Sequence, residues 1–404
     1  MAAIKHVLIA NRGEIAVRIT RTLRELGVEA VAVATPEDRA SLHALRADRV
    51  LALESPLGYL DAEALVALAK GAGCDAVHPG YGFLSENAEF AEACERQGLT
   101  FIGPPAQAIA KMGSKMRARA AMLAAGVPIV PGGDANDLEQ ARATASAIGY
   151  PILIKATDGG GGKGMRRVDS EAELASAFER TTSEAHKAFG NGALYIERAL
   201  ADARHVELQI LGDRQGRIVH LFERDCSLQR RHQKIIEETP CPVLPASTLE
   251  QMAEVARRGA ESIGYFSVGT FEFLLASDGS FYFLEMNTRL QVEHPITELC
   301  TGLDLVREML RVAEGKPLDF EIATRRGAAI EARLYAEDPE HGFLPSAGKI
   351  SGLRAASGPF VRDDSGVYEG ARVSDRYDPM LAKLSVWAPD RAQAIARMRR
   401  ALGE

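Results

Sequence analysis

The first hundred residues alternate between short apolar runs and longer segments in which apolar residues recur every three or four positions. The apolar runs predict buried strands, whereas the longer periodic segments predict helices. The first helix is expected from Glu14 to Leu26, where Gly27 provides a stop signal. We expect strands at 7–10, 30–34, 49–53, 75–78 and 99–102, and helices near Leu42, at 61–70 and at 85–97. Continuous apolar strands separated by helices predict a doubly wound α/β domain, in which helices cover both faces of a parallel sheet.

The pattern changes after Gly103-Pro-Pro105, which marks the end of this first unit. An alanine-rich helical connector follows, and a second unit contains an apolar strand at 151–156 and a glycine-rich loop. Later strands are expected at 205–211, 217–223, 269–275, 280–284 and 329–335. The predicted organisation is an N-terminal α/β domain at 1–103, a connector at 104–126, a small unit at 127–200 and a strand-rich C-terminal domain at 201–404.

Two loops of the first unit are candidate ligand contacts. In doubly wound folds, ligands lie beyond the carboxyl ends of the strands. The loops at 10–13 and 78–83 directly follow two of the predicted strands. They are therefore expected at the edge of the sheet where such folds bind their ligands.

Composition restricts the class of protein further. With 404 residues, 46% of them hydrophobic and 25% charged, the chain can bury a large core and has the length of two or three domains. A net charge of -7 argues against a protein that coats nucleic acid, and no apolar run approaches the ~20 residues of a membrane span. The five cysteines form no CxxC pair, and the start of the chain does not resemble a signal peptide. These features predict a reduced cytoplasmic protein without a zinc site or a disulfide framework.

A glycine-rich loop directly follows the strand at 151–156 and reads Thr157-Asp-Gly-Gly-Gly-Gly-Lys-Gly-Met-Arg166. Successive glycines expose backbone N–H groups without a Cβ in the way, which favours close contact with phosphate oxygens. The context of a dinucleotide-binding loop is missing, and Lys163 precedes Gly164 instead of the Ser or Thr of a Walker A loop. A plain hairpin tip is the alternative. Lys155 favours phosphate binding, because an unpaired ammonium at the end of an apolar strand is costly.

The strongest chemical pattern is a predicted hairpin centred on Asp278-Gly279, the preferred residues of a two-residue turn. Such a turn places Ser277 opposite Ser280. The same register places Glu272 directly opposite Glu285, among aromatic neighbours. Facing carboxylates in an apolar sheet repel each other unless a cation lies between them, and carboxylate and amide oxygens suit Mg²⁺.

Period-two alternation beyond this hairpin places five polar side chains on one face, provided that the chain stays extended. They are Glu285, Asn287, Arg289, Gln291 and Glu293. An exposed strand is the alternative for any single residue, but the whole set favours a site. Two further stretches belong with it: 205–209 alternates like a half-buried strand, and 226–238 concentrates cations beside carboxylates, as an anion pocket or a solvated loop would.

Several ordered motifs resemble those of biotin carboxylase, the ATP-grasp component of acetyl-CoA and related biotin-dependent carboxylases. They lie at 10–16, 78–87, 159–164, 223–227, 230–234, 285–289 and 291–294, and the resemblance covers essentially the whole chain. It implies a ligase with a doubly wound N-terminal domain and an ATP-grasp fold that carries a mobile glycine-rich lid. The implied activity is ATP-dependent carboxylation of biotin by bicarbonate.

The resemblance also implies roles for individual residues. ATP would contact Lys115, Lys155, Gly161, Gly162, Glu197, Arg198, Ala199, Leu200, His205, Gln229 and His232. Mg²⁺ or Mn²⁺ would bind Glu272, Glu285 and Asn287. Bicarbonate would bind Lys234, Arg289, Gln291 and Val292, with Glu293 as the base that deprotonates it, and Arg333 would stabilise the enolate of biotin.

In the implied reaction, bicarbonate attacks the γ-phosphate of ATP, and the resulting carboxyphosphate supplies carbon dioxide to biotin. Closure of the lid would keep water from this labile intermediate. No sequence like Ala-Met-Lys-Met, to which biotin is attached, is present. We therefore expect biotin on a separate carrier protein or on a further part of a longer chain, a carboxyltransferase as another partner, and possible pairing of two copies as a homodimer.

Two features depart from the family pattern. Asp158 stands in the glycine loop where a small uncharged residue is commoner, so the electrostatics of the lid are open. The sequence stops at Glu404, a few tens of residues short of the usual domain end, which leads us to expect a truncated C-terminal domain.

Two other functions stay open on the sequence. One is another ATP-grasp ligase that forms carboxyphosphate, such as carbamoyl phosphate synthetase or a purine-pathway carboxylase, but Arg333 and the set at 289–293 argue against it. The other is a nucleotide-binding regulatory protein without turnover, although every implied catalytic residue is present. The final acceptor also stays open among acetyl-CoA, which would point to fatty acid biosynthesis, propionyl-CoA, a longer acyl-CoA, pyruvate and urea.

Overall fold

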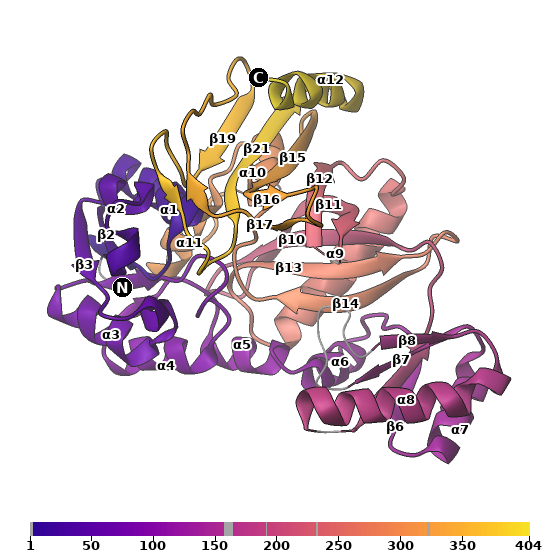
Figure 1. Cartoon of the computed structure of the whole chain (residues 1–404). Coiled ribbons are helices and arrows are strands. Elements are labelled where there is room, and N and C mark those ends of the chain that lie inside the picture. Colours follow the sequence, from indigo (N-terminus) through magenta and orange to yellow (C-terminus); the bar gives the residue numbers. More distant parts are fainter. Residues whose placement is uncertain (1–2, 157–164, 191, 232, 321–323) are drawn as a thin grey trace.

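The computed structural model describes residues 3–156, 165–190, 192–231, 233–320 and 324–404 (Figure 1). In this part of the chain, three sheets of four or more strands form the framework, and helices pack on them. The mixed α/β architecture agrees with the class predicted from the sequence. None of the helices within these ranges has the length and hydropathy needed to cross a membrane.

A five-stranded parallel sheet forms the N-terminal region, in the order β3-β2-β1-β4-β5. Its strands are β1 (His6–Ile9), β2 (Glu29–Ala34), β3 (Arg49–Ala52), β4 (Ala76–His78) and β5 (Thr100–Phe101). The helical segments between them are α1 (Gly13–Glu25), η1 (Pro36–Asp38), α2 (Leu42–Arg46), η2 (Pro56–Leu60), α3 (Ala62–Gly71) and α4 (Ala88–Arg96). Leu8 and Ile9 point to opposite faces of the sheet and are both fully buried, in two separate cores. The predicted doubly wound arrangement is therefore confirmed.

The carboxyl ends of these strands meet other parts of the same chain. Asn11, which follows β1, donates from Nδ2 to two carbonyl oxygens of the loop after β4, at 2.7 Å each. The guanidinium of Arg12 lies 4.1 Å from the centre of the Tyr377 ring, which belongs to the C-terminal region. The first candidate ligand loop, at 10–13, is thus covered by protein, whereas the second leads on to Glu86 in the cavity described below.

An eight-stranded antiparallel sheet forms the centre of the molecule, in the order β14-β13-β10-β11-β12-β15-β21-β19. Its strands are β10 (Arg204–Gly212), β11 (Ile218–Arg230), β12 (Gln233–Thr239), β13 (Ser267–Leu275), β14 (Phe281–Asn287), β15 (Ala328–Tyr335), β19 (Val361–Ser365) and β21 (Met380–Ala388). The helices around it are α5 (Ala106–Met112), α6 (Lys115–Ala124), α9 (Ala246–Ser262), α10 (His294–Thr301), α11 (Leu305–Ala313) and α12 (Arg391–Leu402). Two separate two-stranded sheets lie between β15 and β21 in the chain: β16 (Glu337–Asp338) pairs with β17 (Leu344–Pro345), and β18 (Gly348–Lys349) pairs with β20 (Arg372–Val373).

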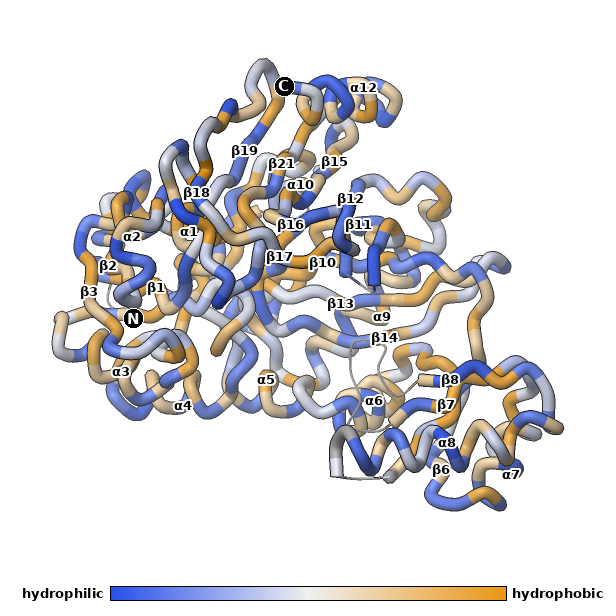
Figure 2. Tube along the Cα trace, in the orientation of Figure 1, coloured by the Kyte–Doolittle hydropathy of each residue, from blue (hydrophilic) through white to orange (hydrophobic). Residues whose placement is uncertain are grey.

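The two faces of the central sheet differ in polarity near β10, β13 and β14. Val206, Leu208 and Ile210 of β10 pack in one core with α9 and the phenylalanines of the hairpin. The intervening residues of β10 point to the opposite face. Figure 2 shows hydrophilic and hydrophobic stretches close together in this part of the molecule. That opposite face includes Glu207, which lies across the ladder from Glu272 of β13. Charged side chains are therefore gathered on one face of a sheet whose other face is apolar.

The β13–β14 hairpin has the predicted pairing but not the predicted turn. The Ala276 N–H donates to the Ser280 carbonyl at 2.8 Å, so Ser280 does not pair with Ser277 in a two-residue turn. Near the turn Phe273 lies opposite Phe283, which is one residue out of the expected register. An irregularity in β14 then inserts one extra residue, and Glu272 lies opposite Glu285 as predicted.

A smaller antiparallel sheet, in the order β6-β9-β7-β8, lies below the central hairpin in Figure 1. Its elements are β6 (Gly132–Ala135), α7 (Leu138–Ile148), β7 (Ile152–Ala156), β8 (Met165–Val168), α8 (Glu171–Phe189) and β9 (Leu194–Arg198). Both helices pack on this sheet and share its apolar core. The glycine loop, with Asp158, lies outside the described residues, and the domain limits at 103, 126 and 200 stay predictions.

Candidate active site

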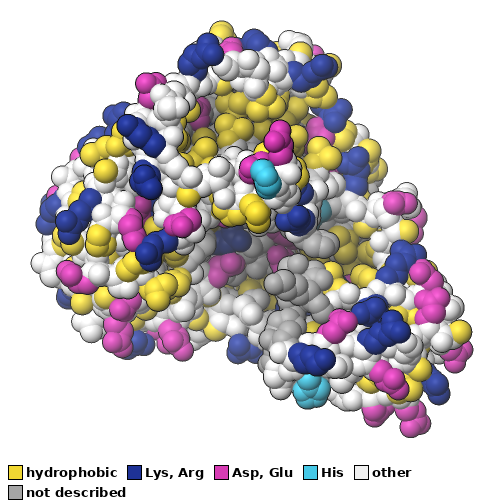
Figure 3. Space-filling view, in the orientation of Figure 1, with side chains coloured by type: hydrophobic (Ala, Val, Ile, Leu, Met, Phe, Trp, Pro, Cys, Tyr) yellow, Lys and Arg dark blue, Asp and Glu magenta, His cyan; other side chains and the backbone are white. Residues whose placement is uncertain are grey.

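A cavity of about 980 Å³ lies between the polar face of the central sheet and the smaller sheet. Figure 3 shows a hollow in this region with basic and acidic side chains inside it. The structure brings together in its lining Lys115, Lys155, Glu197, His205, Gln229, Lys234, Glu272, Glu285, Asn287, Arg289, Gln291, Val292, Glu293 and Arg333. Most residues singled out from the sequence therefore share one cavity, large enough for a nucleotide.

Other predicted contacts are not among the lining residues. The Arg198 side chain donates to the Ile148 carbonyl, and the Ala199 N–H donates to the Pro151 carbonyl at 2.9 Å. Ala199 is buried and Leu200 is half-buried, both directly after β9. Gly161, Gly162 and His232 lie outside the described residues.

Lys234 lies at the centre of the charged group. Its Nζ is 2.5 Å from a carboxylate oxygen of Glu207, 2.7 Å from Glu272 and 2.8 Å from Glu293. Burial alone would lower the pKa of Lys234, but these carboxylates outweigh it and raise the pKa well above its usual range. An anion entering the cavity thus meets a permanently charged ammonium.

Glu293 joins Lys234 to Arg333. Its Oε2 accepts from Nη2 of Arg333 at 3.0 Å, while its Oε1 contacts Lys234. Burial would raise the pKa of Glu293, but the two cations lower it well below its usual range. Arg333 also donates from Nε to Glu237 at 2.6 Å, and burial raises the pKa of Glu237 to about 7 although Arg333 opposes the shift. An ionised carboxylate therefore lies beside one that titrates near neutral pH.

Arg224 supports this group from beneath and is fully buried. It donates to Glu207 at 2.5 Å, to Gln209, Thr297 and Gln291 at 2.8 Å each, and to Thr270 at 3.3 Å. Every side chain in this set comes from a strand of the central sheet or from the segment around α10. A planar guanidinium with five donors fixes these partners in space, so the floor of the cavity is rigidly organised.

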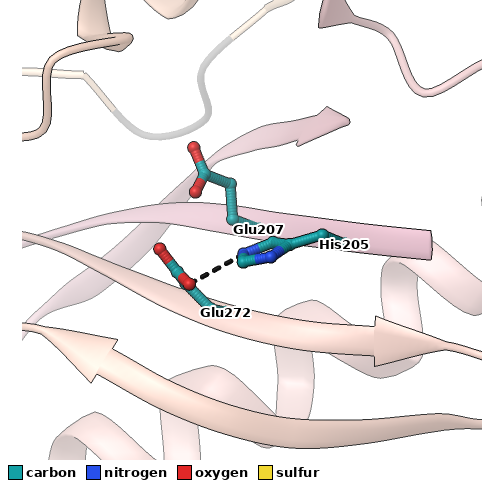
Figure 4. A group of neighbouring side chains, drawn as sticks. All are labelled: His205, Glu207 and Glu272. Atoms are coloured by element: carbon teal, nitrogen blue, oxygen red, sulfur yellow. Dashed lines mark ion pairs between the residues drawn. The ribbon is translucent and has the colours of Figure 1, made fainter. Parts of the chain in front are cut away.

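Glu272 is the main acidic group toward β14. His205 and Glu207 of β10 point toward Glu272 of β13, and their ligand atoms lie within 4.8 Å of one another (Figure 4). The His205 ring lies 2.7 Å from Glu272, which raises the pKa of His205 although burial lowers it. Glu285, across the ladder, is in contact with solvent. The surrounding protein still removes part of the water around its carboxyl, and this desolvation together with the nearby Glu272 raises the pKa of Glu285. Carboxylate oxygens at this place offer ligands for a divalent cation.

The segment after β14 departs from the expected extended form. β14 ends at Asn287 and residues 288–293 belong to no strand, so the condition that the chain stays extended as far as Glu293 is not met. The polar side chains converge nonetheless, because Asn287 and Gln291 both donate to Oε1 of Glu272, at 2.8 and 2.9 Å. Arg289 in turn donates to Oδ1 of Asn287 at 2.7 Å. Side-chain hydrogen bonds, and not an extended strand, therefore bring these polar side chains together.

Two lysines line the cavity on the side of α6 and the smaller sheet. Lys155 of β7 forms an ion pair with Glu197 of the adjacent strand β9. The argument that Lys155 needs a phosphate as its partner therefore does not hold, since a carboxylate is already beside it. Lys115 begins α6 at the edge of the same cavity.

Sequence reasoning assigned no role to several residues that contact the predicted site residues, namely Glu86, Glu207, Arg224, Glu237 and Lys383, the last of which donates to the Val292 carbonyl. Four of them had a usable signal, and one of these is Arg224, which lies in the motif at 223–227. Glu207 lies in the alternating stretch at 205–209, and Glu237 lies near the end of the charged stretch at 226–238. Glu86 lies in the motif at 78–87 and accepts from Nε of Arg289 at 2.9 Å. Their partners come from other strands, which no local pattern reveals.

Three family models match successive parts of the chain. They are the biotin carboxylase N-terminal domain at 3–109, the ATP-binding domain of the carbamoyl-phosphate synthase L chain at 114–321, and the biotin carboxylase C-terminal domain at 331–404. Together with the fold and the charged cavity, these matches define the class of ATP-grasp ligases.

The chain is 49% identical to biotin carboxylase 1 of Bacillus subtilis, over 99% of this chain and 91% of that protein. It is 48% identical to the biotin carboxylase of a Nostoc species, over 98% of this chain and 91% of that protein. Its fold matches the biotin carboxylase domain dimer of Hydrogenobacter thermophilus 2-oxoglutarate carboxylase, solved with MgADP, ADP and bicarbonate. That match has a TM-score of 0.93 at 44% identity and covers 100% of this chain and 90% of the other.

The chain belongs to the biotin carboxylase family. It is a ligase that uses ATP, Mg²⁺ and bicarbonate to carboxylate biotin, the first half-reaction of biotin-dependent carboxylases. The family and the activity expected from the resemblance are thereby confirmed. The alternatives of a carbamoyl phosphate synthetase, a purine-pathway carboxylase and a regulatory protein without turnover are set aside.

Proposed function

We propose that the lining residues divide this reaction among four groups. ATP is contacted by Lys115, Lys155, Glu197, His205 and Gln229, by the backbone at 198–200 and, outside the described residues, by Gly161, Gly162 and His232. The metal is held by Glu272, Glu285 and Asn287. Bicarbonate is held by Lys234, Arg289, Gln291 and Val292, with Glu293 as the base. Arg333 stabilises the enolate of biotin.

The bridge that Glu293 makes between Lys234 and Arg333 carries this proposal. The carboxylate lies 2.8 Å from the ammonium and 3.0 Å from the guanidinium. A base in that position can accept a proton from bicarbonate bound by Lys234 on one side. It also lies next to the place where biotin would bind, beside Arg333, on the other side. Lys234 and Arg333 come from β12 and β15, and Glu293 directly precedes α10, so the sheet itself sets the spacing of the two cations.

The pKa of Glu293 supports a base that becomes active when substrate binds. In the resting arrangement Lys234 and Arg333 hold its pKa well below the usual range, which keeps it ionised but weakly basic. When Lys234 donates to bicarbonate and Arg333 donates to the ureido oxygen, Glu293 loses two cationic partners. The pKa of Glu293 then rises toward the pKa of the bicarbonate hydroxyl whose proton it accepts.

The proposed metal ligands fit the donor preference of Mg²⁺, because they offer two carboxylates and one amide oxygen. Glu272 already accepts from Lys234, Asn287 and Gln291, so metal binding requires some of these donors to turn away. Glu285 is more exposed toward the cavity than Glu272. A bound Mg²⁺ supplies positive charge to the phosphates during phosphoryl transfer.

The partners that follow are a biotin carrier protein or domain and a carboxyltransferase, and two copies of the chain form a homodimer. Acetyl-CoA, the acceptor that would place the enzyme in fatty acid biosynthesis, is one candidate, beside pyruvate and other acyl-CoA substrates. Relatives with similar identity are named for pyruvate and for methylcrotonoyl-CoA. We place the enzyme in the cytoplasm, which suits its five free cysteines.

Separating the two half-reactions tests these roles. Arg333→Ala should lose biotin-dependent ADP release by about 100- to 1000-fold, because a donor to the enolate is removed. It should keep much of the slow ADP release that bicarbonate supports without biotin. Glu293→Gln should lose both activities, since bicarbonate is then no longer deprotonated. Steady-state ADP release is measured with and without free biotin.

Arg257→Ala is the matched control for loss of a guanidinium. Arg257 lies on α9, half exposed, and pairs with Glu254 and Glu261 on the same helix. Its variant should behave like the parent in both assays. Carboxylation of biotin at the parent rate by Arg333→Ala would overturn the assignment of Arg333.

A further inference from the structure

Lys383 is a fully buried lysine that the proposed roles do not use. It lies in β21 directly opposite Arg333 of β15, so both side chains start from the same face of the sheet. Its Nζ donates to the carbonyl oxygen of Val292 at 2.7 Å and lies 3.2 Å from Oε1 of Glu14 in α1. One ammonium therefore connects the N-terminal region to the segment that lines the cavity.

The Val292 carbonyl belongs to the peptide group that leads into Glu293. Because a peptide group is planar, holding this oxygen also sets the direction of the Glu293 N–H and the position of its Cα. Residues 288–293 belong to no strand, so no ladder of backbone bonds aligns them. Side chains hold the segment instead, with Glu86 at its beginning and Lys383 at its end.

The charge of Lys383 is balanced by groups from other elements. Glu14 is buried and also accepts from the Tyr81 hydroxyl, while the Tyr81 ring lies 5.6 Å from Nζ of Lys383. Asp364 of β19 lies across the ladder from Lys383 on its other side. Replacing a buried ion pair by apolar residues is often neutral or stabilising. A lysine at this place is therefore better explained by the position in which it holds the Val292–Glu293 peptide than by a gain in stability.

We propose that Lys383 is a positioning residue for the activation of bicarbonate. By holding the peptide between Val292 and Glu293, it aims the Glu293 carboxylate and the neighbouring backbone at the cavity. The inference rests on the proposed roles of Glu293 and Val292. The competing explanation is that Lys383 only neutralises Glu14.

Four variants of the chain separate these explanations: Lys383→Met, Glu14→Gln, the double variant and Glu293→Gln. Lys383→Met removes the bond to Val292 and leaves Glu14 without its ammonium. The double variant removes the same bond but restores the balance of charge. Glu14→Gln keeps the lysine and its bond. ADP release is measured while bicarbonate and ATP are varied in turn, and thermal unfolding is followed for each variant.

We expect kcat/KM for bicarbonate to fall about 10- to 100-fold in both variants that lack Lys383, as for a small misplacement of a reacting group. The KM for ATP should stay near the parent value, because the lysine does not touch the nucleotide side of the cavity. The double variant should recover the midpoint of thermal unfolding without recovering kcat/KM for bicarbonate. Glu14→Gln should keep kcat/KM for bicarbonate near that of the parent.

Recovery of kcat/KM for bicarbonate in the double variant would overturn the proposal, as would an equal loss in Glu14→Gln. Failure of both Lys383 variants to fold would also overturn it, since the lysine would then be required for folding. Glu293→Gln serves as the reference. If Glu293→Gln loses activity while Lys383→Met does not, only this inference fails, whereas parent-like kinetics of Glu293→Gln would remove the proposed base itself.

Discussion

Two buried histidines of the N-terminal region and the charged cluster on the central sheet are buried in opposite ways. In the N-terminal region, two buried histidines are kept neutral, because burial lowers the pKa of His43 to about 4 and that of His78 to about 3. In the central sheet the charges are kept, since carboxylates raise the pKa of Lys234 and two cations lower that of Glu293. The difference is whether a buried group has a partner of opposite charge.

Sheet type explains why the charged cavity described above forms on the central sheet. The strands of the parallel sheet are covered on both faces, so most of their side chains must be apolar. The antiparallel sheet needs only one apolar face for its core and is free to carry Glu207, Lys234 and Glu272 on the other. The N-terminal region contributes to the site through the loop that carries Glu86, beyond the end of a strand. The N-terminal region therefore supports the position of Arg289, while most of the charged side chains of the cavity come from the central sheet.

Breaking the charge balance beneath the central site should have the largest effect on stability. Arg224→Met leaves Glu207 with one cationic partner fewer in a fully buried place, and such changes cost about 3–5 kcal/mol. Denaturant unfolding measures the loss. The double variant with Glu207→Gln should recover part of it, because the uncompensated charge is then absent. An unchanged free energy of unfolding in Arg224→Met would mean that the buried pair is not needed for stability.

Acid should act on the N-terminal region through His43. The pKa of His43 falls from 6.5 to about 4 on folding, so the unfolded chain binds the proton first as the pH drops. The contribution of a neutral His43, about 3 kcal/mol at most, is present above pH 6.5 and lost as the pH falls toward 4. In His43→Gln the free energy of unfolding should depend less on pH over this window. Equal slopes for parent and variant would contradict the burial of a neutral ring.

The smallest effect on stability is expected from Glu285→Gln. This variant removes one of two like charges, whereas Arg224→Met removes one partner of an ion pair. Here one of two facing carboxylates is removed, so unfolding without Mg²⁺ should become no easier. The Mg²⁺ concentration needed for activity should rise, because an anionic ligand is lost. Glu272→Gln should raise the Mg²⁺ requirement as well, but it should also destabilise the fold, since Lys234 and His205 lose a partner. Unchanged Mg²⁺ dependence in both variants would remove the metal from this hairpin.

Local pattern was enough to predict the strands of the N-terminal sheet, whereas the pairing of Glu272 with Glu285 was predicted from a turn that does not form. Apolar runs and period-two alternation depend only on neighbours in the sequence. The turn was predicted wrongly, because Asp278-Gly279 favours a two-residue hairpin and says nothing of the extra residue farther along β14. The pairing came out right because the irregularity in that strand shifts the register back by one residue.

Contacts between distant elements account for what the sequence did not reveal. Lys383 stands out in no local pattern, and Arg224 only as one residue of the motif at 223–227. The importance of both lies in partners from other strands and helices. Lys155 is a residue that the sequence did single out, but its partner could not be predicted. Its ion pair with Glu197 depends on the pairing of β7 with β9, which connects strands that are far apart in the sequence. Alternation identifies the face of a strand, but only the topology identifies the neighbour.

The contacts between the two ends of the chain also dictate an order of events during synthesis. Arg21 forms an ion pair with Asp364, and the guanidinium of Arg12 packs on the ring of Tyr377. Glu14 forms an ion pair with Lys383. A ribosome therefore releases the N-terminal sheet long before these partners exist. The segment before α10 obtains its last anchor only when β21 has emerged. Closing such distant contacts is slow. A chain interrupted before β21 would already contain the proposed metal ligands and the proposed base, but it would lack the contact between Lys383 and the Val292 carbonyl.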